Sequence, residues 1–72
     1  MDLPKSKQQL VEEVIDKQQR LGISWAELGR RSGYSPASLR TGYMRRSMSY
    51  DRAVRLLETM REYVKDQQEV MK

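Results

Sequence analysis

The chain has 72 residues, 38% of them hydrophobic and 33% charged, which is the ordinary composition of one small helical domain. Cysteine and histidine are absent, so disulfides and the usual zinc and haem ligands are excluded, and no acidic loop has the spacing of a calcium site. We therefore expect no metal and no cofactor. The net charge is +4, and no apolar run exceeds two residues, so neither a membrane span nor a signal peptide is expected.

The first predicted helix covers residues 5–21 and ends at Gly22, a residue type that favours the left-handed conformation of a helix end. Its buried stripe is formed by apolar residues at helical spacing, namely Leu10, Val11, Val14 and Ile15. The second predicted helix covers residues 25–32. Ser24 and Glu27 have the spacing of a capping box at its start.

A tight turn separates the second helix from a third, which is predicted over residues 36–45. Gly33 ends the second helix, again as a residue that tolerates a left-handed conformation. Ser35 is an N-cap residue type, and Pro36 is the residue favoured in the first helical position. Two short helices joined by such a turn have the layout of a helix-turn-helix, in which the second helix reads DNA.

A long fourth helix is predicted after Ser49, which has the residue type of an N-cap. One row of apolar residues at helical spacing is expected to face the core: Tyr50, Ala53, Leu57, Met60 and Val64. A second row runs beside it, formed by Leu56, Tyr63 and Val70. One interpretation is a solvated tail. The other is that residues 61–72 extend the helix into a homodimer contact made by Leu56, Met60, Tyr63, Val70 and Met71.

The excess positive charge lies in the candidate helix-turn-helix and the residues that follow it. Residues 24–55 carry seven arginines against two acidic residues, whereas the flanking segments are close to neutral. The arginines are Arg30, Arg31, Arg40, Arg45, Arg46, Arg52 and Arg55. Because arginine pairs in a bidentate manner with phosphates and with guanine edges, this distribution favours a nucleic-acid partner.

Small and apolar residues occupy the positions that a helix-turn-helix requires. Gly29 lies where the two helices would cross, and Leu39 would point back into the core. With these residues, the segment SWAELGRRSGYSPASL resembles the Cro/cI-type (Xre-like) helix-turn-helix family, and MSYDRAVRLLETM resembles the family's next helix. Gly42 departs from the pattern, which has a branched apolar residue there. The length of the chain indicates a single domain over residues 1–72. The resemblance covers residues 10–60 and implies an all-α, lambda-repressor-like bundle of four or five helices.

The resemblance also implies which residues meet DNA. The positions matching its base-contacting turns are Ser35, Pro36, Ala37, Ser38, Arg40 and Thr41. Arg40 is the side chain best able to read guanine; the alternative is a solvated or phosphate-bound arginine. Contacts with the DNA backbone are assigned to Ser24, Trp25, Arg45, Arg46 and Arg52. Trp25 alternatively packs against the first or fourth helix, and Ser35 alternatively serves as a cap alone.

The sequence thus favours a sequence-specific regulator of transcription that binds double-stranded DNA. By resemblance we expect a small repressor of phage, plasmid or mobile-element type, which occupies an inverted repeat as a homodimer and is cytoplasmic and nucleoid-associated. The alternative is a small helical adaptor that binds protein through the fourth helix. An enzyme is disfavoured because the chain lacks histidine, cysteine and a carboxylate pair beside a nucleophile. RNA binding is disfavoured because no aromatic stacking platform is present.

Overall fold

The computed structural model describes residues 6–70, and side chains for residues 6–68, and within that range it contains four helices and no strand. The helices are α1 (Lys7–Leu21), α2 (Trp25–Ser32), α3 (Pro36–Arg45) and α4 (Tyr50–Val70). The expected all-α fold is confirmed, with four helices rather than five in the described residues. The bounds of α2 and α3 agree with the prediction, whereas α1 begins slightly later than expected.

Serine hydroxyls start all four helices by accepting a backbone N–H of the first turn. These serines are Ser6, Ser24, Ser35 and Ser49. A complete capping box forms at α1, where the N–H of Ser6 also donates to Oε1 of Gln9 at 2.9 Å. The capping box expected at Ser24 and Glu27 is half-formed, because the Glu27 carboxylate binds two arginines of its own helix instead.

Three helices end in a left-handed residue. Gly22 follows α1 with a φ of 67°, and Gly33 follows α2 with a φ of 89°, as the sequence predicts. The end of α3 is different, because Arg46 takes the left-handed conformation with a φ of 50° although it has a side chain. The backbone N–H groups of Arg46 and Ser47 close the helix. They donate to the last carbonyl groups of α3, including that of Gly42.

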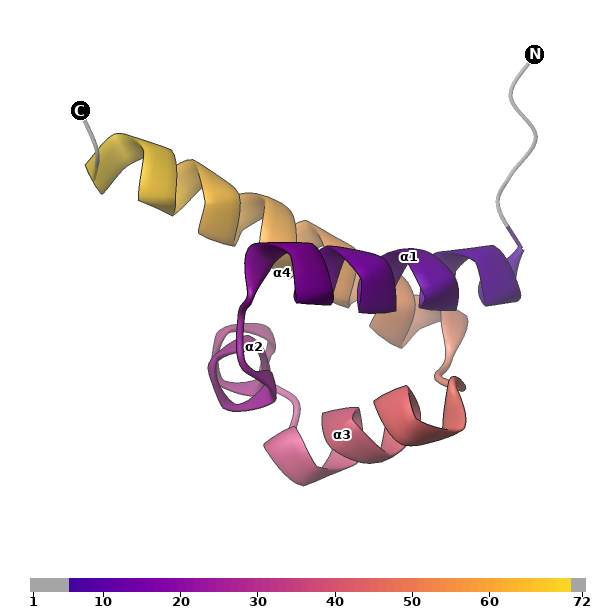
Figure 1. Ribbon diagram of the computed structural model, residues 1–72. Coiled ribbons are helices and arrows are strands. Elements are labelled where there is room, and N and C mark those ends of the chain that lie inside the picture. Colours follow the sequence, from indigo (N-terminus) through magenta and orange to yellow (C-terminus); the bar gives the residue numbers. More distant parts are fainter. Residues whose placement is uncertain (1–5, 71–72) are drawn as a thin grey trace, which may run out of the picture.

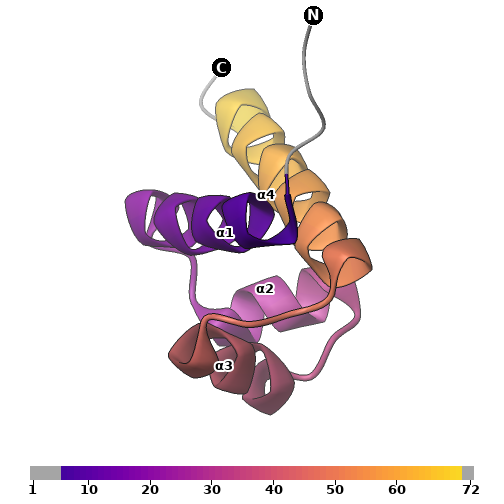
Figure 2. The same ribbon diagram turned by 90° about the vertical axis from the view of Figure 1, so that its right-hand side faces the viewer.

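The four helices enclose one core, and α3 lies at its edge. Both α1 and α2 pack on α4, while α3 packs chiefly on α2. In Figure 1, α2 is seen end-on and α3 lies across the view, so the two helices of the motif cross each other. Figure 2 shows the C-terminal part of α4 continuing beyond the body formed by the other helices. The fully buried residues of the core include Val11, Val14, Leu28, Leu39, Leu56 and Met60.

The inward face of α4 differs from the expected one. Ala53 and Met60 are buried as predicted, but Leu56, which was assigned to a dimer contact, is fully buried in the same core. Leu56 and Met60 therefore belong to the interior of one chain, and their assignment to a surface between two chains is wrong. Tyr50, expected in the core, is 49% exposed. Which row of α4 is buried depends on the directions from which α1 and α2 approach it. The residue spacing along one helix does not reveal these directions.

The remaining residues of the predicted dimer contact have different positions. Tyr63 is half-buried against the core. The side chain of Val70, and Met71 as a whole, lie outside the described residues. Leu57 and Val64, which were expected to face inward, are half-buried on the flank of α4.

Gly42 leaves α3 intact and lets the following linker pass close to it. The residue is buried, and a Cβ atom built there would lie 3.2 Å from the carbonyl oxygen of Ser47 and 3.7 Å from Cε of Met48. The helix continues past it to Arg45. The absence of a branched side chain at this position thus makes room for the linker between α3 and α4, with Met48 filling the core beside it.

Candidate nucleic-acid interface

The side of α3 that faces away from α2 is open to solvent. Leu39 and Gly42 are buried on its inner side. Exposed residues on the outer side include Pro36, Ala37, Arg40, Thr41, Met44 and Arg45. Ala37, Arg40, Thr41 and Met44 follow the i, i+3, i+4, i+7 spacing of a single helix face, which we call the reading face. The structure therefore brings several of the predicted base-contacting residues together on one accessible surface.

Met44 is part of this face although the sequence analysis did not assign it. Its side chain is 73% exposed, the highest value among the large hydrophobic residues of the described chain. The signal that would have found it is its spacing of one heptad from Ala37.

The hydroxyl groups near the reading face are already hydrogen-bonded within the chain. Ser35 Oγ accepts the N–H of Ser38 at 3.1 Å, which confirms Ser35 as the N-cap of α3. Thr41 Oγ1 donates to the carbonyl oxygen of Ala37 at 3.0 Å. Ser38 is half-buried, and its Oγ accepts from Nη1 of Arg52 at 3.0 Å.

Arg52 joins the beginning of α4 to the helix-turn-helix. In addition to the bond with Ser38, its guanidinium lies over the ring of Tyr34, with 4.8 Å between Cζ and the ring centroid. Tyr34 belongs to the turn between α2 and α3, so one side chain contacts the turn and the first turn of the exposed helix. The predicted role of Arg52 at the DNA backbone remains a prediction, and the structure adds a positioning role for α3.

Trp25 packs inward on α3. It is half-buried against the core, and its ring centroid lies 5.3 Å from that of Tyr43 in a tilted arrangement. The hydroxyl oxygen of Tyr43 in turn accepts a hydrogen bond from Nε2 of Gln19 on α1 at 3.2 Å. Trp25 therefore packs inside the protein, as the alternative interpretation predicted. Its ring partner, however, belongs to α3 rather than to α1 or α4. Ser24, before Trp25, is exposed and caps α2.

The arginines in and directly after α3 differ in whether they form ion pairs within the chain. Arg40 and Arg45 are exposed, and neither forms an ion pair with another described residue. Arg46 forms an ion pair with Glu12 of α1, with 3.1 Å between Nη1 and Oε2. Both side chains of that pair are at least half exposed, so the pair contributes little stability but offsets the charge of Arg46.

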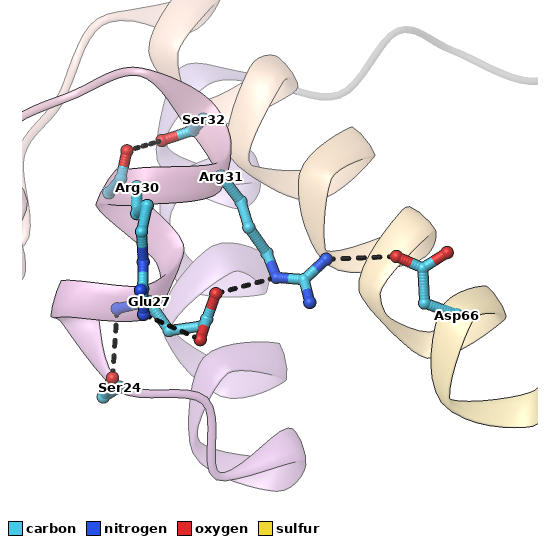
Figure 3. Close-up of polar contacts among 7 residues, drawn as sticks. Ser24, Glu27, Arg30, Arg31, Ser32 and Asp66 are labelled. Carbon is cyan, nitrogen blue, oxygen red and sulfur yellow. Dashed lines mark hydrogen bonds and ion pairs between the residues drawn. The ribbon is translucent and has the colours of Figure 1, made fainter. Parts of the chain in front are cut away.

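Arg31 links α2 to the distal part of α4. Figure 3 shows its guanidinium between two carboxylates, with Nε 3.0 Å from Glu27 Oε2 and Nη1 3.2 Å from Asp66 Oδ2. It also lies over the ring of Tyr63, 5.0 Å from the centroid. The hydrogen bond to Asp66, and after it the contacts with Glu27, raise the pKa of Arg31. Arg31 therefore acts in the fold, which the sequence had not indicated beyond a surface charge.

Arg55 is likewise a structural arginine. Its Nε donates to the carbonyl oxygen of Ser32 at 2.8 Å, so α4 supplies a donor to the last turn of α2. Within the part of the chain that the structure describes, two of the seven arginines of the basic segment thus hold α2 against α4. Of the seven arginines, Arg40 and Arg45 on α3 are exposed and form neither an ion pair nor a side-chain hydrogen bond with another described residue.

Two kinds of site are absent from the described surface. Over residues 6–68, it contains no pocket and no group of three or more acidic residues placed to hold a metal ion. The helices in the described range are all too short or too polar to cross a bilayer. No protein-family model matches the chain, and neither a curated protein nor a solved structure matches it. The resemblance to the Cro/cI-type family therefore rests on the sequence pattern alone.

Proposed function

We propose that the protein binds double-stranded DNA in a sequence-specific manner and regulates transcription, with α3 as the recognition helix. The observation that carries the proposal is the reading face itself. It belongs to a helix that has no acidic residue, it is exposed, and Arg40 at its centre has no ion-pair partner among the described residues. A helix of this kind, mounted across a second short helix, fits the major groove of B-DNA.

Two positive groups outside the reading face support backbone contacts. Arg45 follows it at the end of α3, and the N-terminus of α2, with Ser24 and Trp25, supplies backbone N–H groups and the positive end of a helix dipole. In the proposed complex these groups contact phosphates and fix the orientation of α3. A protein bound in this way represses transcription by occupying its site against polymerase.

Selection of bound duplexes from a random DNA pool tests the proposal directly. We expect enrichment of one sequence pattern, and a binding constant for it that falls steeply with salt, because arginine–phosphate contacts release counterions. Single-stranded RNA of the same length serves as the control ligand and should bind more weakly. A pool from which no sequence is enriched would contradict the proposal and favour the adaptor alternative.

Arg40 is expected to read a base. Replacing it by alanine should weaken binding to the best site by about 1–3 kcal/mol and remove the preference at one base pair. The substitution is on the exposed face of α3, so the fold should not change. Affinities of the variant for the selected site and for a panel of single-base variants measure this. An equal loss on selected and random DNA would identify Arg40 as a phosphate contact instead.

Arg45 is expected to contact the DNA backbone. Arg45→Ala should weaken binding to all sequences alike and make the slope of log K against log salt shallower by about one unit. Arg46→Ala should change the slope less, because Glu12 already offsets its charge. Arg20→Ala on α1 is the matched control, since Arg20 is an exposed arginine paired with Asp16 outside the motif. A slope for Arg45→Ala equal to that of the control would contradict the assignment.

We further propose that the protein binds as a homodimer. One helix-turn-helix reads about half a site, and two copies related by a two-fold axis read an inverted repeat. Since Leu56 and Met60 are in the core, the apolar residues of α4 that remain accessible in the described range include one flank, formed by the exposed Tyr50 and the half-buried Val54, Leu57 and Val64. These residues recur at helical spacing along α4, and we propose them for the contact in place of Leu56 and Met60.

A further inference from the structure

The reading face presents apolar groups around a single cation. Ala37 contributes a methyl group, Thr41 a methyl group beside a hydroxyl that donates to the Ala37 carbonyl, and Met44 a flexible thioether chain. Arg40 is the only charged side chain among them. The nearby Ser38 hydroxyl is held by Arg52. The face therefore offers mostly methyl and methylene groups, and few free hydrogen-bonding groups, to whatever covers it.

The chemistry of base edges identifies which group fits this surface. Adenine is typically read by asparagine or glutamine and cytosine by a carboxylate, and α3 contains none of these side chains. Apolar side chains contact the C5-methyl group of thymine, which is the apolar feature of the major groove. The surrounding arginines complement a polyanion, so the exposure of Met44 is better explained by a DNA groove than by an apolar protein surface.

We infer, on the basis of the proposed function, that Ala37, Thr41 and Met44 read thymine methyl groups, and that Arg40 reads a guanine between or beside them. Ala37 and Met44 are separated by about 10 Å along the helix axis, at about 1.5 Å per residue. That length corresponds to roughly three steps of 3.4 Å between base pairs. The contacted thymines therefore lie within about four consecutive base pairs of each half-site.

Replacing thymine by uracil tests the inference, because the substitution removes the C5-methyl group and keeps base pairing. The enriched duplex is synthesised with deoxyuridine at one position at a time. We expect the dissociation constant to rise by about two- to fivefold at each contacted thymine, the effect of exposing one methyl-sized apolar group. Thymines in the flanks, outside the half-sites, should show no change. In the Met44→Gln variant, uracil should no longer raise the dissociation constant at one end of the contacted segment. It should still raise the constant at the other contacted positions.

The outcomes separate this inference from the proposed function. If a specific site is enriched but no uracil substitution weakens its binding, methyl reading is wrong and DNA binding stands. If uracil weakens binding equally in the wild type and in Met44→Gln at all positions, DNA shape rather than contact with Met44 explains the effect, and the role of Met44 is wrong. If no site is enriched, both proposals fail. Met44 is exposed, so a folded variant is expected, and circular dichroism of Met44→Gln verifies it.

Discussion

Gly29→Ala is expected to destabilise the protein markedly, although it adds only one methyl group. A Cβ atom at Gly29 would lie 2.6 Å from the carbonyl oxygen of Tyr34 and 3.2 Å from the nitrogen of Pro36. These are backbone atoms of the turn and of the first residue of α3, so relief requires α3 to move away from α2. Overpacking of this kind costs about 1–3 kcal/mol or more, and thermal unfolding should begin on the order of 10 °C lower.

Gly42→Ala is the matched control. It makes the same glycine-to-alanine change, but within α3, the helix that Gly29 contacts. Its Cβ would approach the carbonyl of Ser47 at 3.2 Å, a distance that a small shift of the linker relieves. Alanine also gains about 0.5–1 kcal/mol over glycine inside a helix, so the net change should be small. A melting temperature of Gly29→Ala that equals the wild-type value would contradict the close packing of α2, the turn and α3.

The ends of the helices are the part of the fold that the sequence predicts well. They depend on local chemistry: a serine hydroxyl at the starts of α2, α3 and α4, proline after Ser35, and glycine after α1 and α2. The serine cap of α1, at Ser6, was not predicted. Gly29 was expected where the two helices cross and Leu39 in the core. A Cβ atom at Gly29 would meet both the turn, at Tyr34, and the start of α3, at Pro36, and Leu39 is fully buried. These features are readable because each involves residues only a few positions apart.

Contacts between distant residues are the part that the sequence did not predict. Arg31 and Asp66 meet only because α2 packs against α4, and the charge pattern alone shows them as ordinary surface residues. Arg52 reaches Ser38 and the Tyr34 ring for the same reason. The choice between the two apolar rows of α4 also depends on helix packing, so Leu56 was assigned to the wrong surface. In the candidate interface, the residues of the outer face of α3 were predicted up to Thr41, whereas Met44 was not.

The homodimer proposal leads to the prediction with the largest effect on DNA affinity. Replacing both Tyr50 and Val64 by aspartate places two charges on the accessible flank of α4 and should convert a dimer into a monomer. Tyr50 is half exposed and begins α4, where an acidic residue favours the helix dipole, so the fold should persist. Truncation of the end of α4 would be a poorer test, because it would also remove Asp66 from its pair with Arg31.

Loss of the second copy should reduce affinity for an inverted repeat by about 10²–10⁴-fold, because the two half-sites are then bound independently. Affinity for an isolated half-site should stay within error of the wild-type value. Analytical ultracentrifugation should show the mass in solution falling to that of one chain, and circular dichroism should show unchanged helix content. The conservative pair Tyr50→Phe and Val64→Ile controls for the two positions and should remain dimeric. An intact protein that sediments as a monomer at micromolar concentration, and binds one half-site as tightly as the full repeat, would rule out the dimer, because a second copy would then contribute nothing to recognition.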